Sequence, residues 1–114
     1  MRVKIVAYTE CEGGNCPTTY ITDGGTVLVQ GYDMAQPNPA NGLLPGHAFA
    51  EVPPALLERH ARRQGGQRWI APTHPTEQGT VLVAGAVVDD PEALAIVRLP
   101  AGETLVEVTG EVIA

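Results

Sequence analysis

The chain has 114 residues, of which 44% are hydrophobic and 18% charged, and its net charge is −6. This length suits one domain, residues 1–114, that builds a core without metals or disulfides, and the hydrophobic content excludes wholesale disorder. The acidic balance argues against a protein that mainly grips nucleic-acid phosphates, and no apolar run approaches the ~20 residues of a membrane-spanning helix. The N-terminal residues lack an apolar stretch followed by a small-residue cleavage site, so we expect a cytoplasmic protein.

The first half of the chain predicts a series of strands. Residues 2–8 alternate with a period of two, which is typical of a half-buried strand. A turn rich in Thr, Pro and Gly follows, in which the hydroxyl of Tyr20 is expected to reach water. The next strand covers residues 26–30, with its two valines on one face. Prolines and asparagines in residues 35–41 argue against a helix, so we expect a loop there, and residues 47–52 form a closing strand.

A helix over residues 53–64 is predicted between the two halves. Two prolines suit its first turn, and two glycines follow its last. Leu56, Leu57 and His60 share one face at helical spacing, so we expect that face to pack against the strands. His60 is then a partly buried, hydrogen-bonded histidine rather than a metal ligand.

The second half repeats this order of elements. A strand over residues 67–71 is followed by a strand over residues 79–88, which is apolar on both faces and therefore central or barrel-forming. Asp90 is suited to cap a helix that Pro91 begins, and residues 103–109 form the closing strand.

The two halves also match in sequence. Three segments correspond in order, the first at an offset of 54 with six of seven residues identical and the last at an offset of 56. We therefore predict a pseudo-repeat of about residues 1–53 and 66–114, joined by a helix over 53–65. A duplicated β-β-(α)-β unit whose halves cover each other's strand edges predicts a mainly β (α+β) fold, a compact barrel or sandwich. The matched segments are residues 25–31 with 79–85, residues 44–46 with 99–102, and residues 51–52 with 107–108.

Four short segments of the chain form a pattern: CPTTY at residues 16–20, GTVLVQG at 25–31, LPAGE at 99–103 and VEV at 106–108. This pattern resembles that of a family of small actinobacterial proteins. The resemblance covers most of the chain and implies a bacterial cytoplasmic protein with a regulatory or accessory role. That family has no settled activity, so the resemblance transfers no catalytic residue.

The two cysteines, Cys11 and Cys16, are the first candidate site. Their C-x₄-C spacing supplies two thiolates, half of a tetrahedral zinc site that His74 and His47 are able to complete. The sequence holds no second tight ligand pair, which the strong zinc signature requires. Two other interpretations stay open: the thiols form a redox-active disulfide, or they are ordinary reduced cysteines of a cytosolic protein.

The second candidate site is basic. Four of the seven basic residues lie between positions 59 and 68 with no acidic residue among them. Three of them, Arg59, Arg62 and Arg63, lie on the predicted helix and project away from its apolar face. An anion, a nucleic acid or an acidic protein surface is able to dock there. The alternatives are a solvated helix face and pairing with the acidic C-terminal third of the chain. The candidate partner-binding residues are Arg59, Arg62, Arg63, Arg68 and Trp69.

The sequence offers few catalytic groups. It contains no serine, which excludes a Ser-His-Asp nucleophile, and no glycine-rich phosphate-binding loop. We therefore expect a non-enzymatic binding or regulatory module that acts through a protein partner or self-association. The alternatives are a small metal- or thiol-dependent protein that uses Cys11 and Cys16, and a small enzyme whose cleft is lined by Asp23, Tyr20, His74 and Glu77.

Overall fold

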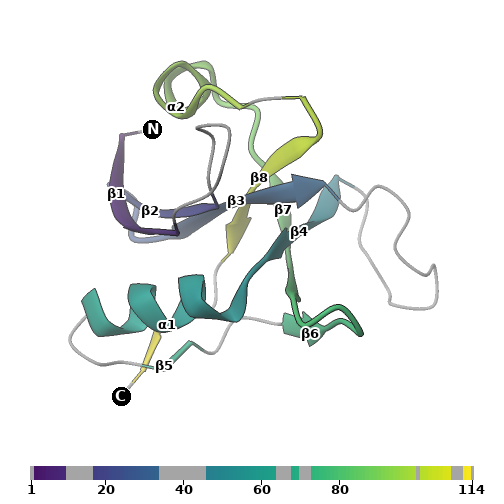
Figure 1. Ribbon diagram of the computed structural model, residues 1–114. Helices are drawn as coiled ribbons and strands as arrows, with labels where there is room; N and C mark the ends of the chain where they lie inside the picture. Colours follow the sequence, from purple (N-terminus) through teal and green to yellow (C-terminus); the bar gives the residue numbers. More distant parts are fainter. Residues whose placement is uncertain are drawn as a thin grey trace.

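The computed structural model describes residues 2–9, 17–33, 46–63, 68–69, 73–99, 101–108 and 112–113. Within these residues the fold is mainly β, as the sequence predicted: seven strands form one antiparallel sheet, two short strands pair separately, and two helices pack beside the sheet (Figure 1). Neither of these helices has the length and apolar character that a membrane crossing requires. The elements are β1 (Val3–Tyr8), β2 (Thr18–Thr22), β3 (Val27–Asp33), β4 (His47–Val52), α1 (Pro54–Arg63), β5 (Arg68–Trp69), β6 (Thr73–Pro75), β7 (Val81–Val87), α2 (Pro91–Val97), β8 (Glu103–Val108) and β9 (Val112–Ile113).

The long strands of the sheet pair with strands from the other half of the chain. β3 pairs along its length with β8, and β7 pairs along its length with β4. Shorter pairings join β3 to β4 and β7 to β8, so the ladder that runs through β3, β8, β7 and β4 returns to β3. β2 extends this ladder from β3, β1 extends it from β2, and β6 extends it from β7.

The register of these pairings recurs at the two offsets seen in the sequence. Val27 pairs with Val108, and Val81, which lies 54 positions after Val27, pairs with Val52, which lies 56 positions before Val108. The pairings of β2 with β3 and of β6 with β7 correspond in the same way. The two halves therefore place corresponding residues in corresponding ladder positions.

In each half, one glycine lies where two strands pass so close to each other that a residue with a side chain would not fit. A Cβ atom on Gly31 would lie 2.5 Å from the carbonyl oxygen of Glu51, and a Cβ atom on Gly85 would lie 2.5 Å from the carbonyl oxygen of Glu107. These glycines lie where β3 meets β4 and where β7 meets β8. Because the obstructing atom is backbone, no change of side-chain rotamer relieves the clash.

A threonine hydroxyl fastens the turn before each long strand to a glutamate of the other half. Thr26 Oγ1 donates to Glu107 Oε2 at 2.6 Å, and Thr80 Oγ1 donates to Glu51 Oε2 at 2.8 Å. Thr26 Oγ1 also lies 2.8 Å from Thr22 Oγ1. The Thr26 hydroxyl already donates its proton to the Glu107 carboxylate. In this second hydrogen bond it is therefore the acceptor, and the Thr22 hydroxyl is the donor. The carboxylates therefore orient the hydroxyls around both turns.

The two faces of β3 belong to different apolar clusters. Val27 and Val29 lie in the first cluster, as predicted from their spacing, together with Leu56 of α1. Leu28 lies in the second cluster, which α2 covers with Ala93 among other residues. Each helix therefore closes one of the two clusters.

Both helices confirm the predictions. The Asp90 carboxylate accepts a hydrogen bond from Ala93 N at 2.9 Å, and Pro91 is the first residue of α2. α1 buries Leu56 and Leu57, the apolar face that the sequence indicated. Local capping and helical spacing were therefore sufficient to locate these elements.

The turns predicted before the two long strands are present at residues 23–25 and 77–79, but each is preceded by a strand, β2 or β6, that the sequence analysis did not predict. β2 and β6 are built from threonine, tyrosine and histidine, which suit a pleated strand. Pro17 precedes β2 and Pro75 ends β6, so neither proline interrupts a central ladder. The expectation for Tyr20 is wrong for the same reason: it lies within β2, only 5% exposed, and its hydroxyl donates to Gln30 Oε1 at 2.8 Å.

The strand predicted over residues 67–71 is described only at residues 68–69. This short strand, β5, pairs with β9 rather than with the seven-stranded sheet. Residues 67, 70 and 71 lie outside the described part of the chain. The strand β9 itself was not predicted.

The two glycine crossings generate a prediction about stability. Replacing Gly31 or Gly85 by alanine forces a Cβ atom against backbone, so each variant should lower the free energy of unfolding by about 2 to 3 kcal/mol. Urea unfolding followed by circular dichroism measures this loss. Gly24→Ala is the matched control, since its Cβ would meet only Thr22 Oγ1 at an ordinary 3.7 Å. Equal stability of Gly31→Ala and Gly24→Ala would contradict the prediction.

Candidate protein-docking site

Basic side chains gather where β1 and α1 pack together. Arg59, Arg62 and Arg63 are exposed on α1, in agreement with the sequence prediction, and Lys4 is exposed on β1. Arg59 Nη1 donates to the carbonyl oxygen of Tyr8 at 2.9 Å, which ties the helix to the end of the strand. We call this surface the cationic face; it is formed by Lys4, Arg59, Arg62 and Arg63.

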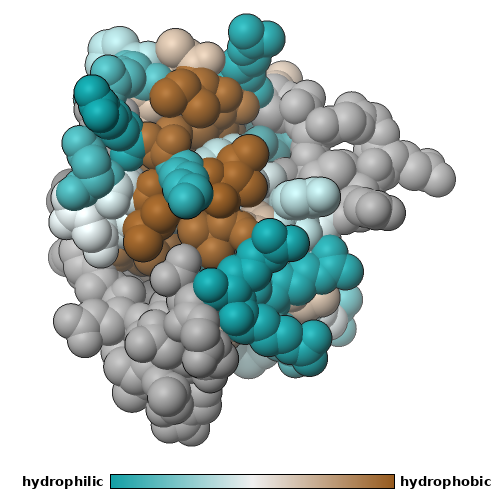
Figure 2. Space-filling model, turned by 90° about the vertical axis from the view of Figure 1, so that its left-hand side faces the viewer, coloured by the Kyte–Doolittle hydropathy of each residue, from teal (hydrophilic) through white to brown (hydrophobic). Residues whose placement is uncertain are grey.

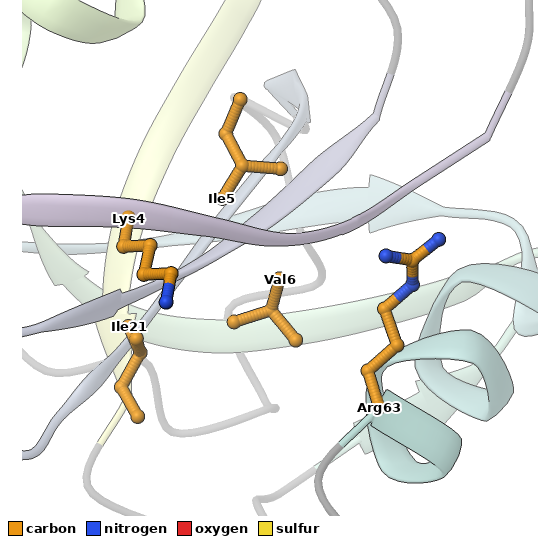
Figure 3. A pocket seen from close by; sticks show the side chains of 5 residues that line it. All are labelled: Lys4, Ile5, Val6, Ile21 and Arg63. Atoms are coloured by element: carbon orange, nitrogen blue, oxygen red, sulfur yellow. The ribbon is translucent and has the colours of Figure 1, made fainter.

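A hollow of about 330 Å³ lies within this face, between β1 and the end of α1. Figure 3 shows Lys4 and Arg63 at its two sides with Val6 between them, and Ile21 of β2 beside Lys4. Ile5, which also lines the hollow, projects from the other side of the β1 ribbon. The hollow therefore combines two cationic groups with an apolar floor.

A β-bulge in β1 places this floor. The register shifts between Ile5 and Ala7, so Val6 is an extra residue in the pairing with β2. An extra residue reverses the alternation of faces, and Val6 and Ala7 are consequently both buried. The strict alternation predicted for residues 2–8 is wrong from this point, and Ile5 is left 57% exposed.

The surface around β1 is largely apolar. β1 lies at one end of the sheet order, and Figure 2, which turns this side toward the viewer, shows apolar residues gathered there with hydrophilic residues around and among them. Ile5 is among the exposed large hydrophobic residues. An exposed apolar patch rimmed by charge is typical of an interaction site.

His60 anchors α1 behind the cationic face. Its ring is fully buried, and Nδ1 lies 2.8 Å from Thr19 Oγ1 of β2. Burial lowers the pKa of His60 to about 4, because the protonated ring would lose its hydration. The imidazole is therefore neutral near pH 7 and serves as a structural contact between α1 and β2.

The residues proposed for a zinc site are only partly described. Cys11 and Cys16 lie outside the described residues. His47 is half-buried at the start of β4, and His74 is exposed on β6, where its ring meets Phe49 edge-on with centroids 5.5 Å apart. Within the described part of the chain, no three His, Cys, Asp or Glu side chains are arranged to hold a metal ion. The zinc hypothesis stays a prediction.

The residues considered for an enzyme cleft lie on β2, on β6 and in the turns before β3 and β7. Asp23 and Glu77 are exposed in the turns before β3 and β7. Asp23 accepts a hydrogen bond from the backbone N of Arg2 at 3.2 Å, and Tyr20 is buried in the cluster that α2 covers. Asp23 and Tyr20 thus make structural contacts.

The remaining predicted docking residues, Arg68 and Trp69, form β5. The structure describes only their backbone, which lies in contact with α1. Their assignment to the docking surface stays a prediction. Lys4 was missed by the sequence reasoning, since a lysine on an edge strand is normally explained as protection against edge pairing.

Comparisons with protein-family models, with curated proteins and with solved structures gave no match to this chain. The chemistry of the cationic face and its hollow is therefore the basis on which a function is assigned.

The buried imidazole generates a prediction about pH. Because the pKa of His60 is lowered in the folded protein, the unfolded chain binds the proton more readily, and stability is lost as the pH falls from 6.5 toward 4. The loss attributable to His60 between pH 7 and pH 4 should be about 3 kcal/mol. Urea unfolding at pH 7 and at pH 4 measures the difference in unfolding free energy between the two conditions.

The matched variants separate His60 from the other titrating groups. His60→Gln should show a smaller pH-dependent loss than the unsubstituted protein, whereas His74→Gln, at an exposed position, should retain it. An unchanged pH dependence in His60→Gln would contradict the assignment.

Proposed function

We propose that the protein is a non-enzymatic binding module that docks a protein partner on its cationic face. The observation that carries this proposal is the hollow between Lys4 and Arg63, which has an apolar floor, in a chain whose net charge is −6. A surface of opposite sign to the whole protein favours a partner with local negative charge.

The chemistry of the hollow favours a protein segment. Two cations flank Val6 and Ile21, so the matching group is a carboxylate next to an apolar side chain. Acidic peptides offer both groups on neighbouring residues. The volume of about 330 Å³ lies at the lower end of the range for small-molecule pockets, roughly 300–1,000 Å³, and fits one or two side chains of a partner.

We also infer that the chain is a duplicated β-β-(α)-β unit whose halves close on each other as a small barrel. The support is the matching register of the ladders, the matching glycine crossings and the matching bonds from threonine to glutamate. The sequence match at offsets of 54 and 56 joins the same positions. Duplication from one ancestral unit accounts for all four correspondences.

The interlocked pairing leads to a prediction about the separate halves. Because β3 pairs with β8 and β7 with β4, residues 1–65 alone and 66–114 alone each lack the main partners of their long strands. Each half should be largely unfolded by circular dichroism, and mixing equal amounts should restore the strand signal of the full chain. A stable fold of either half alone would contradict the interlocked pairing.

Docking on the hollow is tested with a labelled peptide of alternating Glu and Leu, whose binding is followed by fluorescence anisotropy. The protein should bind it in a saturable manner and bind the corresponding Lys and Leu peptide at least tenfold more weakly. Lys4→Gln combined with Arg63→Gln should weaken binding of the Glu peptide about tenfold, because two charge-assisted contacts are lost.

Arg98→Gln is the matched control, since Arg98 is an exposed arginine at the end of α2 and does not line the hollow. Arg59 is left unchanged because it bonds to the backbone of β1. Absence of saturable binding, or equal binding by the double variant and the control, would contradict the proposed docking site.

A further inference from the structure

We propose that the partner at this hollow is a second copy of the chain, which places the exposed face of α2 over it. The inference rests on the proposed function, since it names the occupant of the same site. Three features of the described residues support it: the chemistry of α2, the arrangement of α2 and α1 around β1, and the limited backbone edge of β1.

The exposed face of α2 carries a carboxylate and an apolar side chain, the two kinds of group that the hollow is suited to bind. Ala93 and Val97 are buried under the helix, whereas Glu92 and Ile96 are exposed. Ile96 is 53% exposed. Residues four apart lie on one helix face about 6 Å from each other, so a carboxylate and an apolar side chain are presented together.

The hollow offers a matching surface for both Glu92 and Ile96. The carboxylate of Glu92 suits the space between the Lys4 ammonium and the Arg63 guanidinium. Ile96 suits the apolar floor of Val6 and Ile21. Burying Ile96 removes exposed apolar surface from both copies, and the paired charges give the contact its orientation.

The two complementary surfaces are neighbours in the fold. Leu94 of α2 and Val3 of β1 pack against the same apolar cluster, and α1 contacts β1 from its other side. Figure 1 accordingly shows α2, β1 and α1 in succession along one side of the molecule. A twofold axis beside β1 therefore brings α2 of each copy to the hollow of the other, which gives a closed dimer with two equal contacts.

The backbone of β1 favours a helix over an added strand as the occupant. The bulge at Val6 interrupts the free edge of β1, and the carbonyl oxygen of Tyr8 is already bonded to Arg59. An incoming strand would find only the short stretch before the bulge available for pairing. A helix binds through its side chains and does not meet this limit.

The test is the oligomeric state of the full chain by sedimentation equilibrium over a range of concentrations. The unsubstituted protein should form a dimer. Glu92→Lys should weaken the dimer at least tenfold, and so should Lys4→Glu combined with Arg63→Glu. Combining all three substitutions in one chain reverses both sides of the contact and should restore the dimer. Restoration also shows that the variants are folded.

Glu77→Lys is the charge-matched control, because Glu77 is an exposed glutamate in the turn before β7 and its variant should dimerise like the unsubstituted protein. A monomer at all concentrations would overturn the inference, as would a dimer that neither charge reversal weakens or open-ended oligomers. These results are distinct from a failure of the proposed function, because binding of the Glu and Leu peptide is measured separately, at protein concentrations below those at which the dimer forms and the hollow is occupied.

Discussion

The fold depends on two places where backbone touches backbone, Gly31 against Glu51 and Gly85 against Glu107. At each of them a long strand passes so close to its neighbour that a side chain is excluded. The glutamates that provide these backbone contacts also accept a hydrogen bond from a threonine of the other half. One glutamate in each half therefore fixes both the approach of two strands and the position of the turn before the long strand of the other half. The apolar clusters form around strands that are held in this way.

The candidate site lies where the two halves differ. β1 belongs to the seven-stranded sheet and packs against α1, whereas β5, the corresponding strand of the second half, pairs with β9. The bulge that sets the floor of the hollow is in β1, and the cations come from β1 and α1. The contacts that correspond between the halves lie in the sheet and its turns, whereas the two cations that line the hollow come from elements that differ between the halves.

Sequence patterns predicted the elements whose position is set by interactions between residues close in sequence, such as helix capping and the spacing of apolar residues. Asp90 and Pro91 identified the start of α2, and the spacing of Leu56 and Leu57 identified the buried face of α1. β2 and β6 were missed because their stability comes from pairing with β3 and β7, which no local pattern records. The hollow was missed for a related reason: Lys4 and Arg63 are far apart in sequence, and their approach depends on the bulge and on the packing of α1 against β1.

Electrostatics places a limit on any contact that this molecule makes with its own copy. Two chains of net charge −6 repel at long range, but salt screens that repulsion beyond about 8 Å under physiological conditions. Groups in direct contact lie well inside this distance, so the local signs of charge decide the outcome there. Because the cations of β1 and α1 are concentrated on one face, an acidic helix meets attraction at that face and repulsion from most of the remaining surface. The same distribution that opposes general association therefore directs an acidic partner to the cationic face.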